Sequence, residues 1–199
     1  MATADPLCSS CNKTATTKCP RCNCSWYCSK ACKKVDSPIH KILCREYREF
    51  DLSSRPTTDH HLAIFFAPEK RKPELIWVNC PWKGDEHTGL WQCADSRPYL
   101  DAPLGMSQIQ SNDVLKRPLT DTIRIDYRDT FLIDGSPPNL AVKSLCPRRS
   151  KLTDWRGPLL AYGLQGLGMP RSYIEPNKSR DLDLNDFRHI VDFLLSYGN

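Results

Sequence analysis

Hydrophobic and polar positions along the chain predict several short β-strands. Two apolar runs, residues 62–67 and 75–80, are rich in aromatic and β-branched side chains and flank a charged turn at 69–73, as expected of neighbouring buried strands. Residues 122–127 alternate strictly between polar and apolar side chains, which is typical of a strand with one buried face. A further apolar run, residues 158–164, has the length of a strand.

The last periodic segment, residues 184–197, predicts a C-terminal amphipathic helix. Its apolar side chains recur at helical spacing: Phe187, Ile190, Val191 and Leu194. Asp183 or Asn185 can cap the start of this helix, and Gly198 can end it.

Composition and one polar stretch suggest how the chain is divided. A chain of 199 residues with 40% hydrophobic side chains can bury a core, and its sixteen prolines favour loops and short elements over a helical bundle. The polar, proline-containing stretch 51–59 is interpreted as a linker. It separates a cysteine-rich segment, residues 1–50, from a mixed α+β domain of residues 60–199.

The cysteines concentrate at the N-terminus, where eight of the eleven precede residue 45. Residues 1–7 contain no apolar stretch of the kind that forms a signal peptide, and the run 63–67 is far too short to span a membrane. We therefore expect an intracellular protein, in the nucleus or cytoplasm, with no membrane partner. In a reducing compartment clustered cysteines indicate metal binding before disulfides.

Eight candidate ligands lie at spacings that suit two structural zinc ions. Two Cys-x2-Cys pairs can each form a knuckle, and the other two pairs lie four residues apart, on one face of a helical turn. Ser37 is the expected N-cap, and Pro38 the first residue, of the helix that carries the last pair. A single zinc ion with spare thiols is the alternative that this spacing disfavours. In chain order the ligands are Cys8, Cys11, Cys19, Cys22, Cys28, Cys32, His40 and Cys44.

The ligand order, the step Tyr27-Cys28-Ser29 and the ending from His40 to Cys44 resemble a MYND-type zinc finger. The resemblance implies a small cross-brace finger in which the first and third ligand pairs share one zinc ion and the second and fourth pairs share the other. It would assign one ion to Cys8, Cys11, Cys28 and Cys32, and the second to Cys19, Cys22, His40 and Cys44. More distantly, stretches 63–66 and 186–189 resemble the uncharacterised second half of small fungal MYND proteins.

The same resemblance implies protein partners. MYND fingers bind short proline-containing peptides, through a groove that often holds glutamine directly after the sixth cysteine and tryptophan three residues before the histidine. Those positions are Lys33 and Ser37 in this chain. The resemblance therefore covers the metal scaffold but not these two groove residues.

The charge distribution argues against nucleic acid as a partner. The formal net charge of +5 lies entirely in residues 1–50, which hold nine basic and four acidic side chains. Two zinc ions on seven thiolates would lower that value to about +2. Nucleic-acid binding needs a more strongly basic surface.

Several further residues have alternative interpretations. Cys24 is expected to be a free thiol, with a swapped zinc ligand as the alternative, and Cys80, His87 and Cys93 are expected to be ordinary residues rather than a third metal site. Four tryptophans are expected to pack in the core, with an aromatic cage for a cationic ligand as the alternative. They are Trp77, Trp82, Trp91 and Trp155. The basic run 148–151 is interpreted as a solvated turn.

The chain contains no Gly-x-Ser-x-Gly, Walker or His-Glu-x-x-His motif, and residues 136–139 lack the Asn-His part of the SET methyltransferase motif that they approach. We therefore expect a non-catalytic, zinc-binding adaptor for protein–protein interaction. The alternatives are a nucleic-acid-associated transcriptional regulator and an enzyme of unrecognised type in residues 60–199. A pocket with acidic or histidine residues of shifted pKa would favour the enzyme, and the carboxylates near 126–134 are a place to look.

Overall fold

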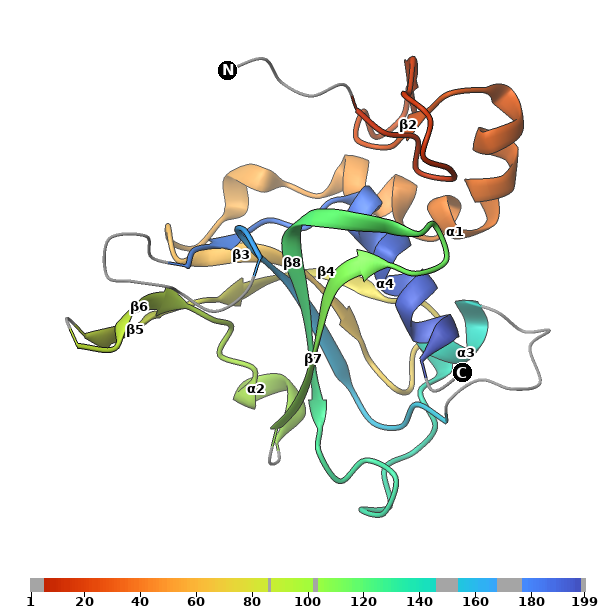
Figure 1. Cartoon of the computed structure of the whole chain (residues 1–199). Coiled ribbons are helices and arrows are strands. Elements are labelled where there is room, and N and C mark those ends of the chain that lie inside the picture. The colour runs from red at the N-terminus through yellow and green to blue at the C-terminus, as the bar shows by residue number, and fades with distance from the viewer. Residues whose placement is uncertain (1–5, 86, 102–103, 146–153, 168–176, 198–199) are drawn as a thin grey trace.

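A computed structural model describes residues 6–85, 87–101, 104–145, 154–167 and 177–197. Its centre is a six-stranded antiparallel sheet in the order β4-β3-β9-β8-β7, with the short strand β10 paired to β9 (Figure 1). These strands are β3 (His60–Phe66), β4 (Glu74–Asn79), β7 (Leu104–Asn112), β8 (Arg117–Arg128), β9 (Leu159–Leu164) and β10 (Ser179–Arg180). Two small hairpins accompany the sheet: β1 (Thr17–Lys18) with β2 (Trp26–Tyr27), and β5 (Trp82–Asp85) with β6 (Gly89–Gln92).

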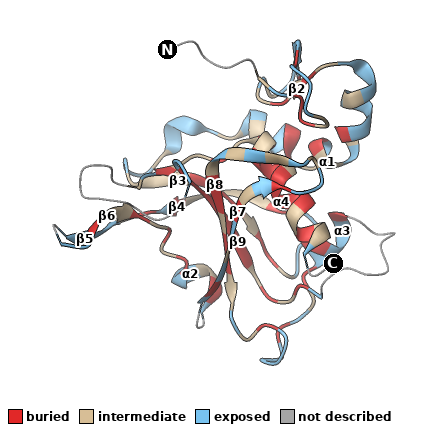
Figure 2. Cartoon of the chain, viewed as in Figure 1, coloured by how far each residue is buried: buried red, intermediate tan, exposed pale blue. Residues whose placement is uncertain are grey.

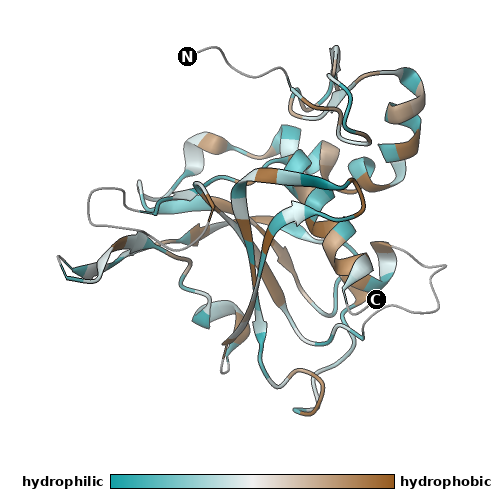
Figure 3. Ribbon diagram, in the orientation of Figure 1, coloured by the Kyte–Doolittle hydropathy of each residue, from teal (hydrophilic) through white to brown (hydrophobic). Residues whose placement is uncertain are grey.

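All four predicted strand segments lie in this sheet, in β3, β4, β8 and β9, so those predictions are confirmed. The sequence did not reveal β7, because only Ile109 among its nine residues is a buried large apolar side chain. The central strands and α4 carry many of the hydrophobic residues (Figure 3).

The sheet is covered on both faces. All six residues of β9 are buried, and five of them divide between two core clusters: Leu159 and Ala161 belong to the larger one, Leu160, Tyr162 and Leu164 to the smaller.

The prediction of a single buried face for residues 122–127 is therefore wrong. Asp126, on the face expected to be solvated, is 1% exposed. Its carboxylate accepts a hydrogen bond of 2.6 Å from Oγ of Ser96 and forms an ion pair of 2.8 Å with Arg124. The segment that follows β6 covers this face and supplies the partner for the buried carboxylate.

Five helical segments are described: α1 (Lys30–Glu49), the 3₁₀ turn η1 (Leu52–Ser54), α2 (Arg97–Leu100), α3 (Leu140–Leu145) and α4 (Leu184–Ser196). Asp183 caps α4 as predicted and forms a capping box with Asp186, whereas Gly198 lies outside the described residues. The helix is buried over most of its length (Figure 2). Its polar residues Asp186, His189 and Asp192 are also buried, because α4 packs against both β7 and α1.

The expected helix start at Ser37 is wrong. One continuous helix, α1, begins after Ser29, whose hydroxyl accepts a hydrogen bond of 3.2 Å from the backbone N–H of Cys32. Pro38 lies inside α1 and removes one backbone donor. The helix continues because it carries zinc ligands on both sides of Pro38, Cys32 before it and His40 and Cys44 after it, and because it packs against α4.

The finger and the sheet share one core. The larger cluster joins Tyr27, Leu43 and Cys44 of the finger to Ile64 of the sheet and Phe187 of α4. Because these side chains are buried together, the finger does not swing freely on the sheet.

Residues 51–59, interpreted above as a linker, also contact the sheet. Oγ of Ser54 accepts a hydrogen bond of 3.2 Å from Nε1 of Trp77, and Arg55 forms an ion pair of 2.6 Å with Asp181. The described helices include none long and apolar enough to cross a membrane.

Candidate metal centre

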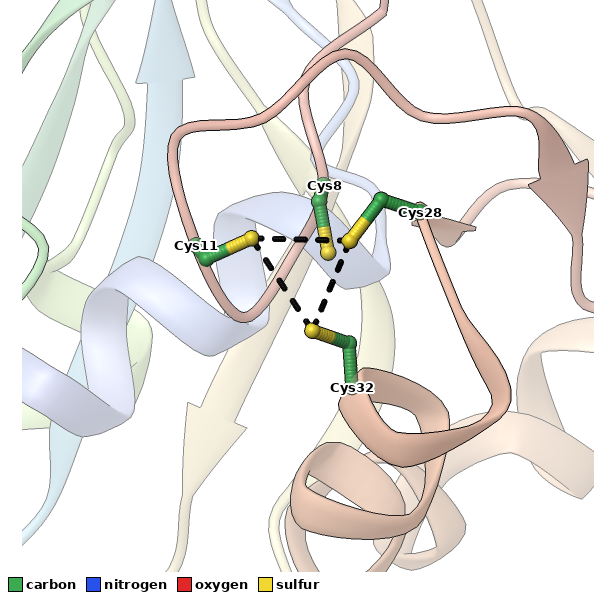
Figure 4. A group of neighbouring side chains, drawn as sticks. All are labelled: Cys8, Cys11, Cys28 and Cys32. Atoms are coloured by element: carbon green, nitrogen blue, oxygen red, sulfur yellow. Dashed lines mark hydrogen bonds between the residues drawn. The ribbon is translucent and has the colours of Figure 1, made fainter.

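The first ligand group joins a loop to the start of α1. Cys8 and Cys11 form a knuckle, closed by a hydrogen bond of 3.3 Å from the N–H of Cys11 to the carbonyl of Cys8. Cys28 follows β2, and Cys32 lies in the first turn of α1. The sulfur of Cys11 lies 3.6 Å from that of Cys28 and 3.9 Å from that of Cys32, and the sulfurs of Cys28 and Cys32 are 3.5 Å apart (Figure 4).

The second group joins the β1–β2 hairpin to the middle of α1. Cys19 and Cys22 lie in the hairpin turn, and His40 and Cys44 are one helical turn apart in α1. Nε2 of His40 lies 3.3 Å from the sulfur of Cys19 and 3.8 Å from that of Cys22. The sulfurs of Cys19 and Cys44 are 3.9 Å apart.

Both groups have the geometry of closed tetrahedral zinc sites. The ligand atoms of each group all lie within 4.8 Å of one another. A tetrahedral zinc ion with Zn–S bonds of about 2.3 Å separates its sulfur ligands by about 3.8 Å, close to the separations above. Sets of four cysteines, and of three cysteines with one histidine, are both common around structural zinc. The two groups therefore fit two zinc ions.

The surroundings orient His40 and favour ionisation of some of the ligand thiols, whereas the neighbouring thiol of Cys32 raises the pKa of Cys28 and burial raises that of Cys44. Nδ1 of His40 lies 3.1 Å from Oγ of the buried Ser25, so that Nδ1–H can donate while Nε2 binds metal. The pKa of Cys22 is lowered, chiefly because the Cys24 thiol donates a hydrogen bond of 3.5 Å to its sulfur. Burial opposes ionisation of Cys8, but contacts to the backbone of Ser10 and Cys28 outweigh it and lower the pKa of Cys8 to about 7.

All eight predicted ligands converge, and they do so in the interleaved pairs that the resemblance implied: Cys8, Cys11, Cys28 and Cys32 in one group, Cys19, Cys22, His40 and Cys44 in the other. Cys24 belongs to neither group. Cys80 is fully buried in the smaller core cluster with Cys93 against it. No third metal-binding group occurs in the parts of the chain that the structure describes.

The tryptophans, the carboxylates near residues 126–134 and the basic run 148–151 were the other candidates. Trp155 is buried and stacks on Phe131, while the guanidinium of Arg55 covers Trp77 at 4.5 Å from the ring centre. Near the end of β8, Arg128 forms an ion pair of 3.1 Å with Asp134. The basic run 148–151 lies outside the described residues.

A hollow of about 210 Å³ opens beside the second ligand group. We call it the α1 groove, and its lining residues are Cys19, Pro20, Arg21, Lys33, Ser37, His40, Lys41 and Cys44. Lys33 and Ser37, the two positions that differ from the MYND pattern, thus line it. Arg21 and Lys41 complete a basic rim that ligand spacing alone did not reveal.

A second hollow, of about 230 Å³, is polar and lies between α4 and β8; it is lined by Leu119, Thr120, Asp121, Arg180, Asp183, Asn185, Asp186 and His189. Burial and the nearby Asp186 raise the pKa of Asp183 to about 6. Burial and the Arg117 guanidinium lower the pKa of His189 to about 4.

The polar side chains that line this second hollow form hydrogen bonds and ion pairs with other residues of the chain. Asp183 caps α4, and Asp186 forms two hydrogen bonds, of 2.7 and 2.8 Å, with the guanidinium of Arg180. His189 contacts Asn112 at 2.8 Å and Arg117 at 3.2 Å. These contacts stabilise α4 on the sheet, which accounts for the cluster in structural terms.

Of the comparisons with known proteins, only the one with protein-family models found a match, and this match lies in the finger. No curated protein and no solved structure matches the chain significantly. The family model described as the MYND finger matches residues 8–44, the span from the first zinc ligand to the last. The N-terminal segment of this chain thus carries a MYND finger whose two ligand groups fit two zinc ions.

Proposed function

We propose that the chain is a non-catalytic adaptor whose finger binds a partner protein. MYND fingers are protein-interaction modules. Each zinc site has four protein ligands, which leaves no position open for a substrate or an activated water molecule. The metal therefore stabilises the finger, and binding is assigned to the surface that it supports.

The α1 groove carries this proposal. It runs beside the second zinc site, that of His40, so the metal that orders the finger also holds the two walls of the groove together. One wall is the hairpin turn at Pro20 and Arg21, and the other is one face of α1. A groove between fixed walls binds with little loss of conformational entropy.

Affinity purification with point variants tests the proposal. Deleting residues 1–50 is unsuitable because it would remove buried side chains such as Tyr27 and Leu43 from the shared core. Ser37→Leu instead fills the α1 groove, and Val35→Leu adds the same side chain at a position of α1 that is 67% exposed and outside the groove. Zinc content and thermal unfolding of each variant report whether the finger is intact.

We expect Ser37→Leu to lose the proteins that co-purify with the wild type, and Val35→Leu to keep them. If both variants recover the same proteins as the wild type, binding does not use the groove and takes place on another surface of the chain. Recovery that falls steeply as the salt concentration rises, and that is lost when nuclease is added, would favour the nucleic-acid alternative.

A further inference from the structure

The α1 groove has the dimensions of a site for a short extended segment. Lys33, Ser37, Lys41 and Cys44 line it at steps of four, four and three residues, so they share one face of α1. With a rise of 1.5 Å per helical residue, the lined stretch is about 16 Å long. An extended peptide advances about 3.3 Å per residue, so about five residues would fit along it.

The groove is basic on its rim and apolar inside. Arg21, Lys33 and Lys41 are exposed, and none of the described residues that line the groove is acidic. Pro20 and two ligand cysteines provide apolar or weakly polar surface between them. A site of three thiolates, one neutral histidine and one zinc ion carries about one negative charge, which the three cations exceed.

These three cations, like Lys30 and Lys34 of α1, have no ion-pair partner among the described residues, whereas several nearby basic side chains are paired. Arg45 and Lys70 form ion pairs of 3.1 and 2.6 Å with glutamates four residues later, and Lys72 pairs with Glu46 at 3.8 Å. Among the described residues, no carboxylate lies within ion-pair distance of Arg21, Lys33 or Lys41. The groove therefore presents charge that the chain itself does not balance.

We propose that the α1 groove binds an acidic, extended peptide segment of the partner protein, a proposal that rests on the proposed function. Carboxylates of the segment pair with Lys33 and Lys41 on α1 and with Arg21 on the opposite wall. An apolar side chain of the same segment packs on Pro20 between them. A short groove with three cations reaches few phosphates of a nucleic acid, which binds by neutralising many along its length.

Selection from a random peptide library on the immobilised, zinc-loaded full chain tests the charge class without assuming a sequence. We expect the selected pool to be enriched in aspartate and glutamate, and labelled peptides from it to bind with an affinity that falls as salt rises. Lys33→Gln and Lys41→Gln should each weaken these peptides by about two- to fivefold, the range of an exposed ion pair. Lys34→Gln, the matched control on α1 outside the groove, should bind like the wild type.

Three results would overturn the proposal: a selected pool with no acidic excess, no selection at all, or an equal loss of affinity in Lys34→Gln. Stronger binding of a single-stranded oligonucleotide than of any selected peptide would replace the peptide by nucleic acid. The two proposals can fail separately. If Ser37→Leu loses the co-purified proteins while no acidic peptide is selected, the adaptor stands and only the acidic class is rejected.

Discussion

Nη1 of Arg188 in α4 lies 3.1 Å from Oδ1 of Asp36 in α1, so a buried ion pair joins the last helix to the finger. Asp36 is 2% exposed, and its other carboxylate oxygen accepts a hydrogen bond of 2.7 Å from the hydroxyl of Tyr27. Nε of Arg188 lies 3.0 Å from Asp192. One guanidinium thus balances two carboxylates that are both buried.

Replacing Arg188 should be strongly destabilising. Arg188→Met leaves Asp36 and Asp192 without their cation, and removing one partner of a buried ion pair costs about 3–5 kcal/mol. Urea unfolding of the zinc-loaded chain measures this loss. Arg45→Met, which removes an exposed pair with Glu49, should change stability by less than about 1 kcal/mol. Similar losses in the two variants would show that burial does not set the strength of the Arg188 contacts.

Zinc content distinguishes ligands from their neighbours. Cys44→Ser should reduce the bound zinc from two ions per chain towards one, whereas Cys24→Ser should retain both, because Cys24 lies outside both ligand groups. Mass spectrometry under native conditions counts the ions directly. Loss of an ion from Cys24→Ser alone would reassign that thiol as a ligand.

Metal removal should affect more than the finger. In zinc-finger peptides metal binding supplies about 10–16 kcal/mol of apparent folding free energy, and here the finger shares its core with the sheet. Chelation should therefore lower protection from hydrogen exchange in β3 and α4 as well as in the finger. Unchanged protection in α4 would show that the sheet folds independently of the metal.

The contact between Ser25 and His40 should tune zinc affinity. Ser25→Ala removes the acceptor for Nδ1–H of His40, and loss of such a partner weakens metal binding by about 10- to 100-fold. Competition with a fluorescent zinc chelator measures the change, with a stoichiometry of two ions retained. Ser9→Ala removes another buried finger hydroxyl that does not contact a ligand side chain, and it should have little effect on affinity.

His189 should make the fold less stable in acid. Its pKa falls from 6.5 to about 4 on folding, because burial and Arg117 disfavour the charged ring. Between these values the unfolded chain binds more protons, so stability decreases as pH falls from about 6.5 to 4, by up to about 3 kcal/mol.

Comparison with His189→Asn isolates this effect, because asparagine does not titrate and zinc loss acts on both proteins. The raised pKa of Asp183 changes stability in the opposite direction, and it too is common to both. The stability difference between the two proteins, measured by urea unfolding at each pH, should shrink on acidification. A difference that is constant with pH would show that His189 is not held neutral.

The sequence by itself determined the metal ligands and the most strongly patterned elements. The spacing of eight cysteine and histidine residues is local information, because each pair needs only a knuckle or one helical turn to aim its ligands. The same holds for β3, β4 and β9, which are short continuous apolar runs, and for α4, whose apolar side chains recur at helical spacing.

Only the tertiary structure decided what depends on distant partners. Pro38 signals a helix start in isolation, yet α1 continues through it because zinc ligands and α4 hold both halves. Asp126 occupies a polar position of an alternating strand, yet it is buried because Ser96 and Arg124 satisfy its carboxylate. The basic rim of the α1 groove likewise unites Arg21 and Lys41, which the sequence separates and the shared zinc site brings together.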